Sequence, residues 1–389
     1  MSEQQRYRVL KRLASGGMAE VFVAESAGIE GFKKQVAIKR VLPQLSKKQQ
    51  FIEMFLDEAR LSAHLSHSNV VSVFDIGVGD GTYFIVMEFV DGADLKAVME
   101  HHKKINRPVP VEIAVFITAK ICQGLAYAHE LENLEGQPLS IVHRDITPAN
   151  VLITKYGEVK IVDFGLAKAS SQLAESDAGV IKGKFGYLAP ETVLELGVDH
   201  RVDIFALGII LWEMLAGKRL FLGDTDFATV RLVREANVPQ LSKINDAVPR
   251  ELEQIIGKAL SRDQASRYTS ARDFGRDLTR LLFKLGRAVN EDDVAKTVRA
   301  AMGVPGHPVD GTQKIADLID LMLLEFKSLT KDSNASTGTS IFPDDAMDEP
   351  GPRSEGMELG GLADELEGPD PTAAPEESGV AGWFRGLVR

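Results

Sequence analysis

Oxygen-bearing side chains in two short segments are the residues of this sequence best suited to chemistry. Asp145 and Asn150 stand five positions apart in one segment, and Asp163 follows in the next. Mg²⁺ is a small, hard cation that binds a few carboxylate or amide oxygens and completes its octahedron with phosphate and water. The spacing therefore predicts a site that holds nucleotide phosphates through Mg²⁺.

Two features upstream fit the same chemistry. Gly16 and Gly17 lie in a turn between two strand-like runs, and glycine lets backbone N–H groups approach phosphates closely. A simple hairpin turn would explain this pair of glycines equally well. Lys39 lies among apolar neighbours in a strand-like run, and a buried ammonium group needs a partner. Glu58, in the helical segment that follows, is the candidate partner.

The pattern of apolar residues predicts the elements that position these groups. Residues 6–90 alternate strand-like runs with one helical segment at residues 50–65, and residues 94–285 are mostly helical. Two short strands, at residues 151–153 and 159–161, carry the segments with Asp145, Asn150 and Asp163. Amphipathic segments continue to about residue 330, the clearest at residues 314–329. The strand-like runs of the first part are residues 6–13, 20–24, 36–41, 70–78 and 83–89.

Composition limits the class of protein. The chain has 389 residues, of which 44% are hydrophobic and 26% charged, as in soluble globular proteins. Residues 331–389 hold 13 acidic and 4 basic residues, so −9 of the net charge of −11 belongs to this tail. Its abundance of Pro, Gly, Ser, Asp and Glu predicts disorder. The nearly neutral remainder gives no electrostatic support for nucleic-acid binding.

Membrane and redox features point to the cytoplasm. The longest apolar run that we identify, residues 204–215, is too short to span a bilayer, and the N-terminus has no apolar signal segment. We therefore expect no membrane span. The single cysteine, Cys122, excludes an intrachain disulfide framework and is typical of a buried packing residue. A reducing, cytoplasmic location fits these observations.

Four motifs in a fixed order complete the pattern. They are Val36-Ala37-Ile38-Lys39, His143-Arg144-Asp145, Asp163-Phe164-Gly165 and Ala189-Pro190-Glu191. With them the sequence resembles the eukaryotic-like protein kinases of bacteria over residues 7–285. It is most similar to the myxobacterial group in its Gly-Gly-Met turn, an insert at residues 131–141 and the segment at residues 183–187.

The resemblance implies an α+β fold with two lobes. A small lobe, residues 7–90, would hold a five-stranded sheet and one main helix, and a larger, mostly helical lobe would span residues 91–285. A helical extension at 286–330, an acidic disordered tail at 331–378 and an aromatic, basic terminal motif at 379–389 would follow.

The resemblance also assigns roles by position. Asp145 would orient the substrate hydroxyl and accept its proton, Lys39 would hold the α- and β-phosphates, and the backbone of residues 88–90 would read the adenine edge. The cofactors would be ATP with Mg²⁺, or Mn²⁺ as an alternative. The implied catalytic residues are Asp145, Lys39 and Asn150, and we add Lys184 as a hypothesis of our own, explained below. The implied nucleotide-binding residues are Leu13, Ala14, Gly16, Gly17, Val21, Ala37, Lys39, Glu58, Met87, Glu88 and Val90, and the implied metal ligands are Asn150 and Asp163.

Some residues that the family shares are expected to support the scaffold. Glu191 would pair with Arg267, and Asp203 would brace the backbone of the catalytic loop from a buried helix. We expect His143 to act with them as a structural residue, without a chemical step of its own.

The glycine-rich turn departs from the family pattern. Ala14 and Ala19 stand where the family has its first and third glycines. A methyl group at each position predicts a stiffer loop, provided that neither residue needs a positive φ.

The catalytic loop and the segment before the anchor also depart from the pattern. Thr147 stands where Ser/Thr kinases of the family usually carry Lys, and Lys184 stands where they carry Thr. We hypothesise that the two positions have exchanged roles, so that Lys184 supplies the positive charge to the γ-phosphate. The alternative is that Lys184 points to solvent.

The segment between the metal loop and the Ala-Pro-Glu anchor, residues 166–188, contains three serines, Ser170, Ser171 and Ser176. Arg144 precedes the catalytic Asp, which in the family marks kinases whose activation segment is ordered by a phosphate–arginine pair. We expect autophosphorylation in this segment, with Ser176 nearest the usual acceptor region.

The function favoured by the sequence is an ATP-dependent serine/threonine protein kinase that acts on protein substrates. The alternative is a pseudokinase or scaffold that recruits partners through its tail. A small-molecule kinase is disfavoured by the Ala-Pro-Glu anchor, and tyrosine specificity by the sequence of the catalytic loop. The terminal motif, with Trp383 and Phe384 beside two arginines, would form a peptide docking motif for a partner, a weak membrane contact, or neither.

Overall fold

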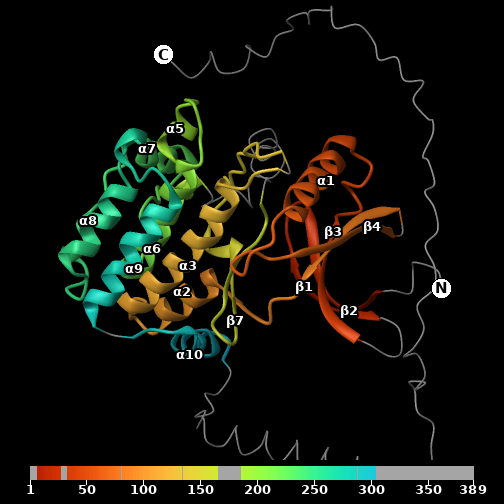
Figure 1. The fold of residues 1–389 in the computed structure, drawn as a ribbon, viewed down its shortest axis with the longest axis horizontal. Coiled ribbons are helices and arrows are strands. Elements are labelled where there is room, and N and C mark those ends of the chain that lie inside the picture. Colours follow the sequence, from red (N-terminus) through yellow and green to blue (C-terminus); the bar gives the residue numbers. More distant parts are fainter. Residues whose placement is uncertain are drawn as a thin grey trace, which may run out of the picture. The chain divides into compact units, whose positions relative to one another are not determined.

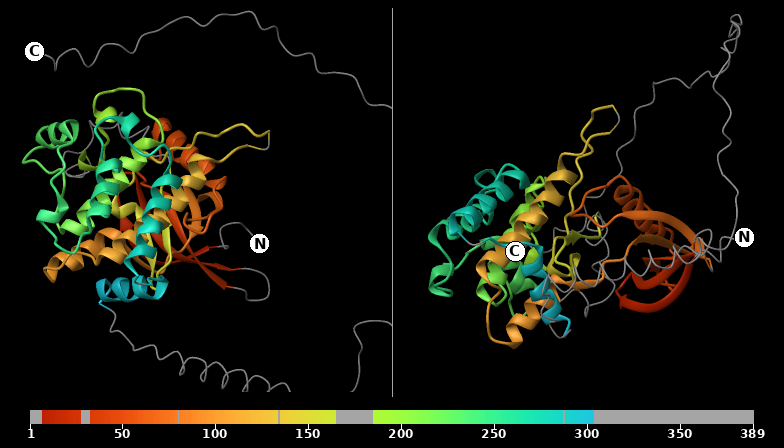
Figure 2. Two further views of the ribbon diagram at one scale, coloured as in Figure 1. Left: turned by 60° about the vertical axis from the view of Figure 1, so that its left-hand side comes forward. Right: turned by 60° about the horizontal axis from the view of Figure 1, so that its bottom comes forward.

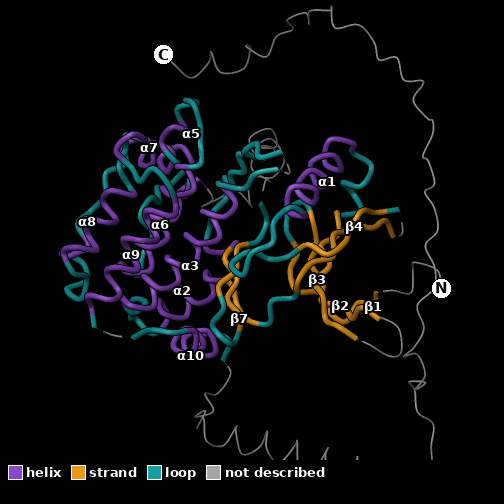
Figure 3. Tube along the Cα trace, viewed as in Figure 1, coloured by secondary structure: helices purple, strands orange, loops and turns teal. Residues whose placement is uncertain are grey.

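Most strands gather at one end of the fold together with one helix, and the other helices gather at the opposite end beside a few short strands (Figure 3). The computed structural model describes residues 7–27, 33–79, 81–133, 135–164, 185–286 and 288–303. All of these belong to one compact unit, Met1–Pro308. The tail, the terminal motif and the predicted segment at residues 314–329 lie outside the described residues.

Five antiparallel strands and one helix form the small lobe (Figure 1). The strand order is β1-β2-β3-β5-β4, and the residue pairing places Val21 and Ile85 on either side of Lys39. The helix buries Phe55 and Ala59 against the sheet. The bounds are β1 Tyr7–Ser15, β2 Ala19–Ala27, β3 Lys33–Val41, α1 Gln49–Ala63, β4 Val73–Gly79 and β5 Thr82–Glu88.

Helices form the large lobe around two apolar members that are buried on nearly every side. The helix α6 is buried from Val202 to Leu215, and α3 contributes most of its residues to the same core. Such helices suit the interior of a lobe, because α6 leaves no face for water between Val202 and Leu215 and α3 leaves only a narrow stripe that includes Lys120 and Gln123. The bounds are α2 Leu95–Lys104, α3 Val111–His129, α5 Pro190–Val193, α6 Arg201–Ala216, α7 Asp226–Glu235, α8 Arg250–Ala259, α9 Ala271–Leu285 and α10 Glu291–Ala301.

The outer helices of the large lobe show ordinary amphipathic and capping patterns. The helix α9 begins at Ser270, whose side chain accepts a hydrogen bond from the Asp273 N–H, and ends at Gly286 with φ of 67°. A hydroxyl at the N-cap satisfies one of the free N–H groups of the first turn, and glycine adopts the left-handed C-cap at little cost. The helix packs along α3 and closes the core.

One helix of the large lobe has the length and hydropathy of a membrane span. Within the described residues only α3 meets both criteria. It is longer than the apolar run identified in the sequence at residues 204–215, and that run lies in α6. However, 72% of its apolar stretch is buried inside the fold. Burial in the core of the large lobe therefore accounts for the high hydropathy of α3.

A small three-stranded sheet carries the catalytic and metal-binding loops. Its strands are β6 Gly92–Asp94, β7 Val151–Thr154 and β8 Val159–Ile161. The sequence predicted β7 and β8 but not β6, which is only three residues long. Gly92 in β6 allows a close approach, since a Cβ atom there would lie 1.9 Å from the carbonyl oxygen of Ile153.

The insert between α3 and His143 forms a projecting turn (Figure 2). Glu132 and Pro138 form a bridge between its two sides, and the Asn133 side chain accepts hydrogen bonds from the N–H groups of Glu135 and Gln137. An asparagine that bonds its own backbone in this way stabilises a tight turn. The tip of the insert is thus ordered by its own hydrogen bonds, whereas Ile141 at the end of the insert is buried in the core of the large lobe.

Candidate active site

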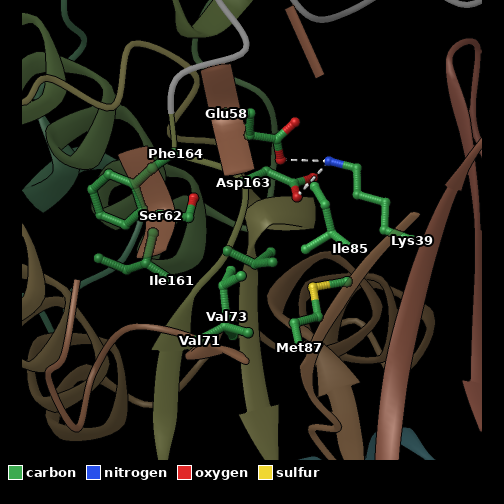
Figure 4. Close-up of a pocket in the computed structure, with 11 residues that line it drawn as sticks. Lys39, Glu58, Ser62, Val71, Val73, Ile85, Met87, Ile161, Asp163 and Phe164 are labelled. Carbon is green, nitrogen blue, oxygen red and sulfur yellow. Dashed lines mark hydrogen bonds and ion pairs between the residues drawn. The ribbon is translucent and has the colours of Figure 1, made fainter. Parts of the chain in front are cut away.

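Lys39, Glu58 and Asp163 meet in the cleft between the lobes (Figure 4). The ammonium of Lys39 on β3 lies 2.6 Å from Glu58 Oε1 on α1 and 2.9 Å from Asp163 Oδ1. Lys39 and Glu58 are both buried, with 7% and 5% of their surfaces exposed. The predicted partnership of Lys39 and Glu58 is confirmed, and Asp163 joins it from the large lobe.

The pKa shifts favour the charged forms of Lys39 and Asp163 but the neutral form of Glu58. Burial by itself lowers the pKa of Lys39, but the charges of Asp163 and Glu58 outweigh it and hold the pKa above its ordinary value. Burial raises the pKa of Glu58 against the opposing effect of Lys39. Burial also acts to raise the pKa of Asp163, but the Lys39 ammonium overcomes it and lowers that pKa. One cation facing two carboxylates leaves room for another positive charge.

The catalytic loop brings the other two oxygen-bearing residues together. The Asn150 amide donates hydrogen bonds to the backbone carbonyl of Asp145 at 2.8 Å and to its carboxylate at 3.1 Å. The carbonyl of Asn150 accepts a hydrogen bond from the Val162 N–H, one residue before Asp163. Asp145 and Asn150 are therefore in direct contact, and a backbone hydrogen bond ties Asn150 to the residue before Asp163.

Asp203 holds the catalytic loop from beneath, as predicted. Its carboxylate accepts hydrogen bonds from the N–H groups of His143 at 2.9 Å and Arg144 at 2.8 Å, and His129 contacts it at 2.8 Å. Burial favours a higher pKa for Asp203, but the hydrogen bond to His129 and the other nearby donors keep the pKa below its usual value. A buried carboxylate with this many donors is well suited to fixing a backbone.

The backbone is strained next to the carboxylate of Asp145 in the catalytic loop and at Asp163 in the metal-binding loop. Arg144 has φ of 65° and Asp163 has φ of 66°, both in the left-handed region. Non-glycine residues there cost about 1–3 kcal/mol each and persist only where surrounding contacts hold them. His143 supplies such contacts, because its ring donates to the Val162 carbonyl and accepts from the Asp145 N–H.

The donor set suits a divalent metal bound together with phosphate. Asn150 uses its amide nitrogen on Asp145, and no hydrogen bond between described residues uses its side-chain oxygen. No group of three or more His, Cys, Asp or Glu within the described ranges could hold a metal by itself. Asn150 and Asp163 therefore fit Mg²⁺ as two ligands of a shell that phosphate and water complete.

An apolar cluster, called the apolar slot below, joins the lobes beside these polar groups, and its members Val71, Met87 and Val162 line the same pocket as Lys39 and Asp163. Ala37, Val71 and Met87 form its buried centre, and the residues packed on them include the predicted Val21 and Val90. Leu152 and Val162 complete the slot from the large lobe. Neither residue is among the predicted nucleotide-binding residues, although Leu152 lies in the predicted strand β7. Leu13, by contrast, is 45% exposed and lies outside this cluster.

The segment that connects the lobes begins at Glu88. Its carboxylate pairs with Lys160 of β8 at 2.9 Å, and its N–H donates to the Ser72 carbonyl. No hydrogen bond between described residues takes up the N–H of Val90. The side chain of Glu88 thus ties the lobes together, and the backbone of Val90 remains suitable for a ligand.

The glycine-rich turn closes the hairpin of β1 and β2. The Gly16 N–H donates to the Ala19 carbonyl, and a Cβ atom at Gly17 would meet nothing within 4 Å. Ala14 and Ala19 are not among the described residues with positive φ. Alanine can therefore occupy both positions without backbone strain. Gly17 therefore has open space around it.

The anchor after the activation segment is also confirmed. Arg267 donates two parallel hydrogen bonds to Glu191, at 2.5 and 2.7 Å, and both side chains are almost fully buried. Lys184 and the three serines Ser170, Ser171 and Ser176 lie outside the described residues.

The match with known families agrees with this geometry. Residues 7–276 match the family described as the protein kinase domain. The chain belongs to the protein kinase family. Members of this family use ATP and a divalent metal in general. The predicted two-lobed fold and the bacterial eukaryotic-like character of the kinase are confirmed.

Relatives and solved structures refine the comparison. The chain is 42% identical over 270 residues to the tyrosine-protein kinase MasK of Myxococcus xanthus, and 35% identical over 273 residues to the serine/threonine-protein kinase PrkC of Bacillus subtilis. The matches cover 69% and 70% of this chain but only 42% and 40% of those relatives. The PknI kinase domain of Mycobacterium tuberculosis matches with a TM-score of 0.52 and 26% identity, covering 71% of this chain and 96% of that domain.

Proposed function

We propose that this protein transfers the γ-phosphoryl group of ATP to serine or threonine hydroxyls of protein substrates. The observation that carries the proposal is the meeting of Lys39, Glu58 and Asp163 in one cluster, with Asp145 and Asn150 linked beside it. Phosphoryl transfer depends on positioning and charge stabilisation more than on covalent chemistry. This arrangement supplies both.

Each residue has a distinct part in the proposed reaction. Lys39 binds the α- and β-phosphates, and Glu58 fixes its direction. Asn150 and Asp163 hold Mg²⁺, which neutralises charge on the phosphates when bound. Asp145 orients the attacking hydroxyl and accepts its proton, and the Asn150 amide holds the Asp145 carboxylate in place.

The adenine ring is proposed to bind in the apolar slot. Ala37 and Val21 would contact one face and Leu152 the other, with Met87 at the back. The Val90 N–H would donate to the adenine edge. Gly16 and Gly17 would cover the phosphates, since nothing in the structure crowds Gly17.

Serine/threonine specificity is the finer part of the proposal. One relative is named a tyrosine-protein kinase, whereas PrkC and several other relatives are named serine/threonine-protein kinases. The catalytic loop sequence Ile146-Thr147-Pro148-Ala149 lacks the arginine typical of tyrosine enzymes. Identification of the phosphorylated amino acid after acid hydrolysis separates the two specificities.

Lys184 is proposed to supply a positive charge to the γ-phosphate in place of the usual lysine. Thr147, at the usual position, is 8% exposed and carries no charge. Substitution of Lys184 by Ala is expected to lower kcat by about 10²-fold, as for other transition-state donors. A kcat within about threefold of the parent would refute this role.

Regulation and location form the remaining proposals. Autophosphorylation is expected on Ser170, Ser171 or Ser176, and mass spectrometry of active protein that finds no phosphate between residues 166 and 188 would remove it. We propose a cytoplasmic location, with protein substrates and a docking partner for the terminal motif.

The deciding experiment uses the full chain with γ-labelled ATP, Mg²⁺ and a basic protein acceptor. The control is Asp145→Asn, which keeps the shape of the side chain next to Asn150 but removes its basicity. We expect labelled acceptor with the parent only, equal nucleotide binding by both proteins, and loss of transfer when the metal is chelated. Nucleotide binding without transfer by the parent, even after treatment with an upstream kinase, would favour the scaffold alternative.

A further inference from the structure

The helix α10 lies beyond the residues shared with the kinase family, which end at 276, yet it is built into the large lobe. Its apolar face buries Val294, Ala295 and Val298 completely, and it packs against α2, α3, β6 and β7. Figures 1 and 2 show it beneath α2, next to β7. Asn290 and Asp293 cap its first turn reciprocally. A helix fixed this firmly can position its neighbours.

Both ends of α10 contact the turn between β7 and β8. At the beginning of the helix, Glu291 approaches Gly157 so closely that a Cβ atom on Gly157 would lie 1.8 Å from the Glu291 carbonyl oxygen. Toward its end, the Arg299 guanidinium donates to the Lys155 carbonyl at 3.0 Å. Gly157 also has φ of 95°, which only glycine adopts readily. The turn is therefore shaped to receive this helix.

The same turn contacts the segment that connects the lobes. The N–H of Lys155 donates to the Asp91 carbonyl at 2.8 Å, and its ammonium lies 2.7 Å from the Asp91 carboxylate. Asp91 directly follows Val90, whose backbone N–H is the proposed adenine contact. A chain of contacts thus runs from Arg299 through Lys155 and Asp91 to the adenine slot.

We propose that α10 positions the nucleotide-binding segment, with Arg299 and Lys155 as positioning residues for the adenine contact. This inference rests on the proposed use of ATP. The helix restrains the turn, the turn restrains Asp91, and Asp91 fixes the direction of the Val90 N–H. Loss of the restraint acts on nucleotide affinity, because none of these residues touches the transferred phosphate.

The test compares Arg299→Ala, Arg299→Lys and the parent, as full chains. Arg299→Ala is expected to raise the KM for ATP and the Kd for ADP by about three- to tenfold, as for loss of one charged hydrogen bond. The kcat at saturating ATP should stay within about twofold, because the catalytic loop is untouched. Arg299→Lys should restore part of the affinity, since the ammonium can reach the same carbonyl.

A matched control comes from the same helix. Lys296→Ala removes a charge whose only ion pair among the described residues is with Asp293 one turn earlier. It should leave KM, Kd and kcat at parental values. If Arg299→Ala lowers the melting temperature so far that kinetics are unreliable, Asp91→Asn tests the other end of the contact chain without altering α10.

Each outcome decides the inference. A KM and an ADP Kd within 1.5-fold of the parent for both Arg299→Ala and Asp91→Asn overturn it, even if the parent is a normal kinase. Equal losses in Arg299→Ala and Lys296→Ala overturn it as well, because they indicate a general effect of the helix. A parent that binds no adenine nucleotide refutes the proposed function itself, and so the two failures are distinguishable.

Discussion

Two buried ion pairs of this protein have similar chemistry but different surroundings. Glu191 and Arg267 use both oxygens and both terminal nitrogens on each other, and Arg267 Nε donates to the Ser261 carbonyl. In the active site, Lys39 divides its ammonium between Glu58 and Asp163, and Glu58 Oε2 is buried without a hydrogen-bond partner among the described residues.

The difference separates a structural pair from a functional one. The charges of Glu191 and Arg267 compensate each other. Replacing either residue therefore leaves a buried charge uncompensated. The Lys39 group sets one ammonium against two carboxylates, so it can take a further cation such as a metal ion. We therefore expect the first pair to control stability and the second to control activity.

Lys39→Met should produce the largest effect on activity. Loss of the ammonium that holds the phosphates should lower kcat/KM by about 10²- to 10³-fold. Stability should fall by less than about 2 kcal/mol, because Glu58, whose pKa is already raised, can take up a proton when its partner is lost. Steady-state kinetics and urea unfolding measure the two quantities. Unfolding at much lower urea concentration would contradict the distinction.

Arg267→Met should produce the largest effect on stability. Removal of one partner of a buried pair costs about 3–5 kcal/mol, because the other charge is left behind. The control is Lys284→Met, which breaks an exposed pair with Glu251 and should cost less than about 1 kcal/mol. Calorimetry on the two variants gives the comparison directly. Equal melting temperatures would show that the Glu191 pair contributes nothing beyond a surface contact.

Glu58→Gln should have an intermediate effect on activity alone. Glutamine can still accept a hydrogen bond from Lys39 but lacks the charge that fixes the ammonium, and so kcat/KM should fall about tenfold. The unfolding free energy should be unchanged or higher, because a buried carboxylate with a raised pKa is removed. A loss of stability similar to that of Arg267→Met would place Glu58 with the structural pair.

Ala14→Gly should have the smallest effect and sets a baseline away from both pairs. Because Ala14 is exposed and does not need a positive φ, glycine adds only flexibility and should cost about 0.5–1 kcal/mol of stability. The KM for ATP should change by less than about threefold. A larger rise in KM, measured at fixed acceptor concentration, would mean that stiffness of the turn matters for phosphate binding.

Most of the small lobe could be predicted from sequence, because its strands have regular apolar patterns between clear turns. The predicted runs at residues 36–41 and 83–89 lie within or close to β3 and β5, and the helix predicted at residues 50–65 is α1 within two residues at each end. The metal loops were located by residue type and spacing. Their predicted contacts, including Lys39 with Glu58 and Asp203 with the catalytic loop, follow from the family pattern.

Features that depend on packing between distant segments could not be predicted in this way. The strand β6 is too short to show a periodicity, and its existence depends on pairing with β7 sixty residues later in the chain. Leu152 and Val162 join the nucleotide slot only because the two lobes meet there. The contact of Arg299 with Lys155 is a hydrogen bond to a backbone carbonyl. Because every residue has such a carbonyl, the sequence does not indicate which one Arg299 will contact.

The long apolar helix α3 has a consequence for folding during synthesis, because it is made well before the helix that covers it. Its main cover, α9, begins at Ala271, well over a hundred residues after α3 ends at His129. At about 5–20 residues per second, a ribosome needs roughly 7–30 seconds to add them. During this interval a 19-residue helix with the hydropathy of a membrane span lacks its covering partner. Truncated chains that end before α9 should therefore be bound by chaperones or aggregate.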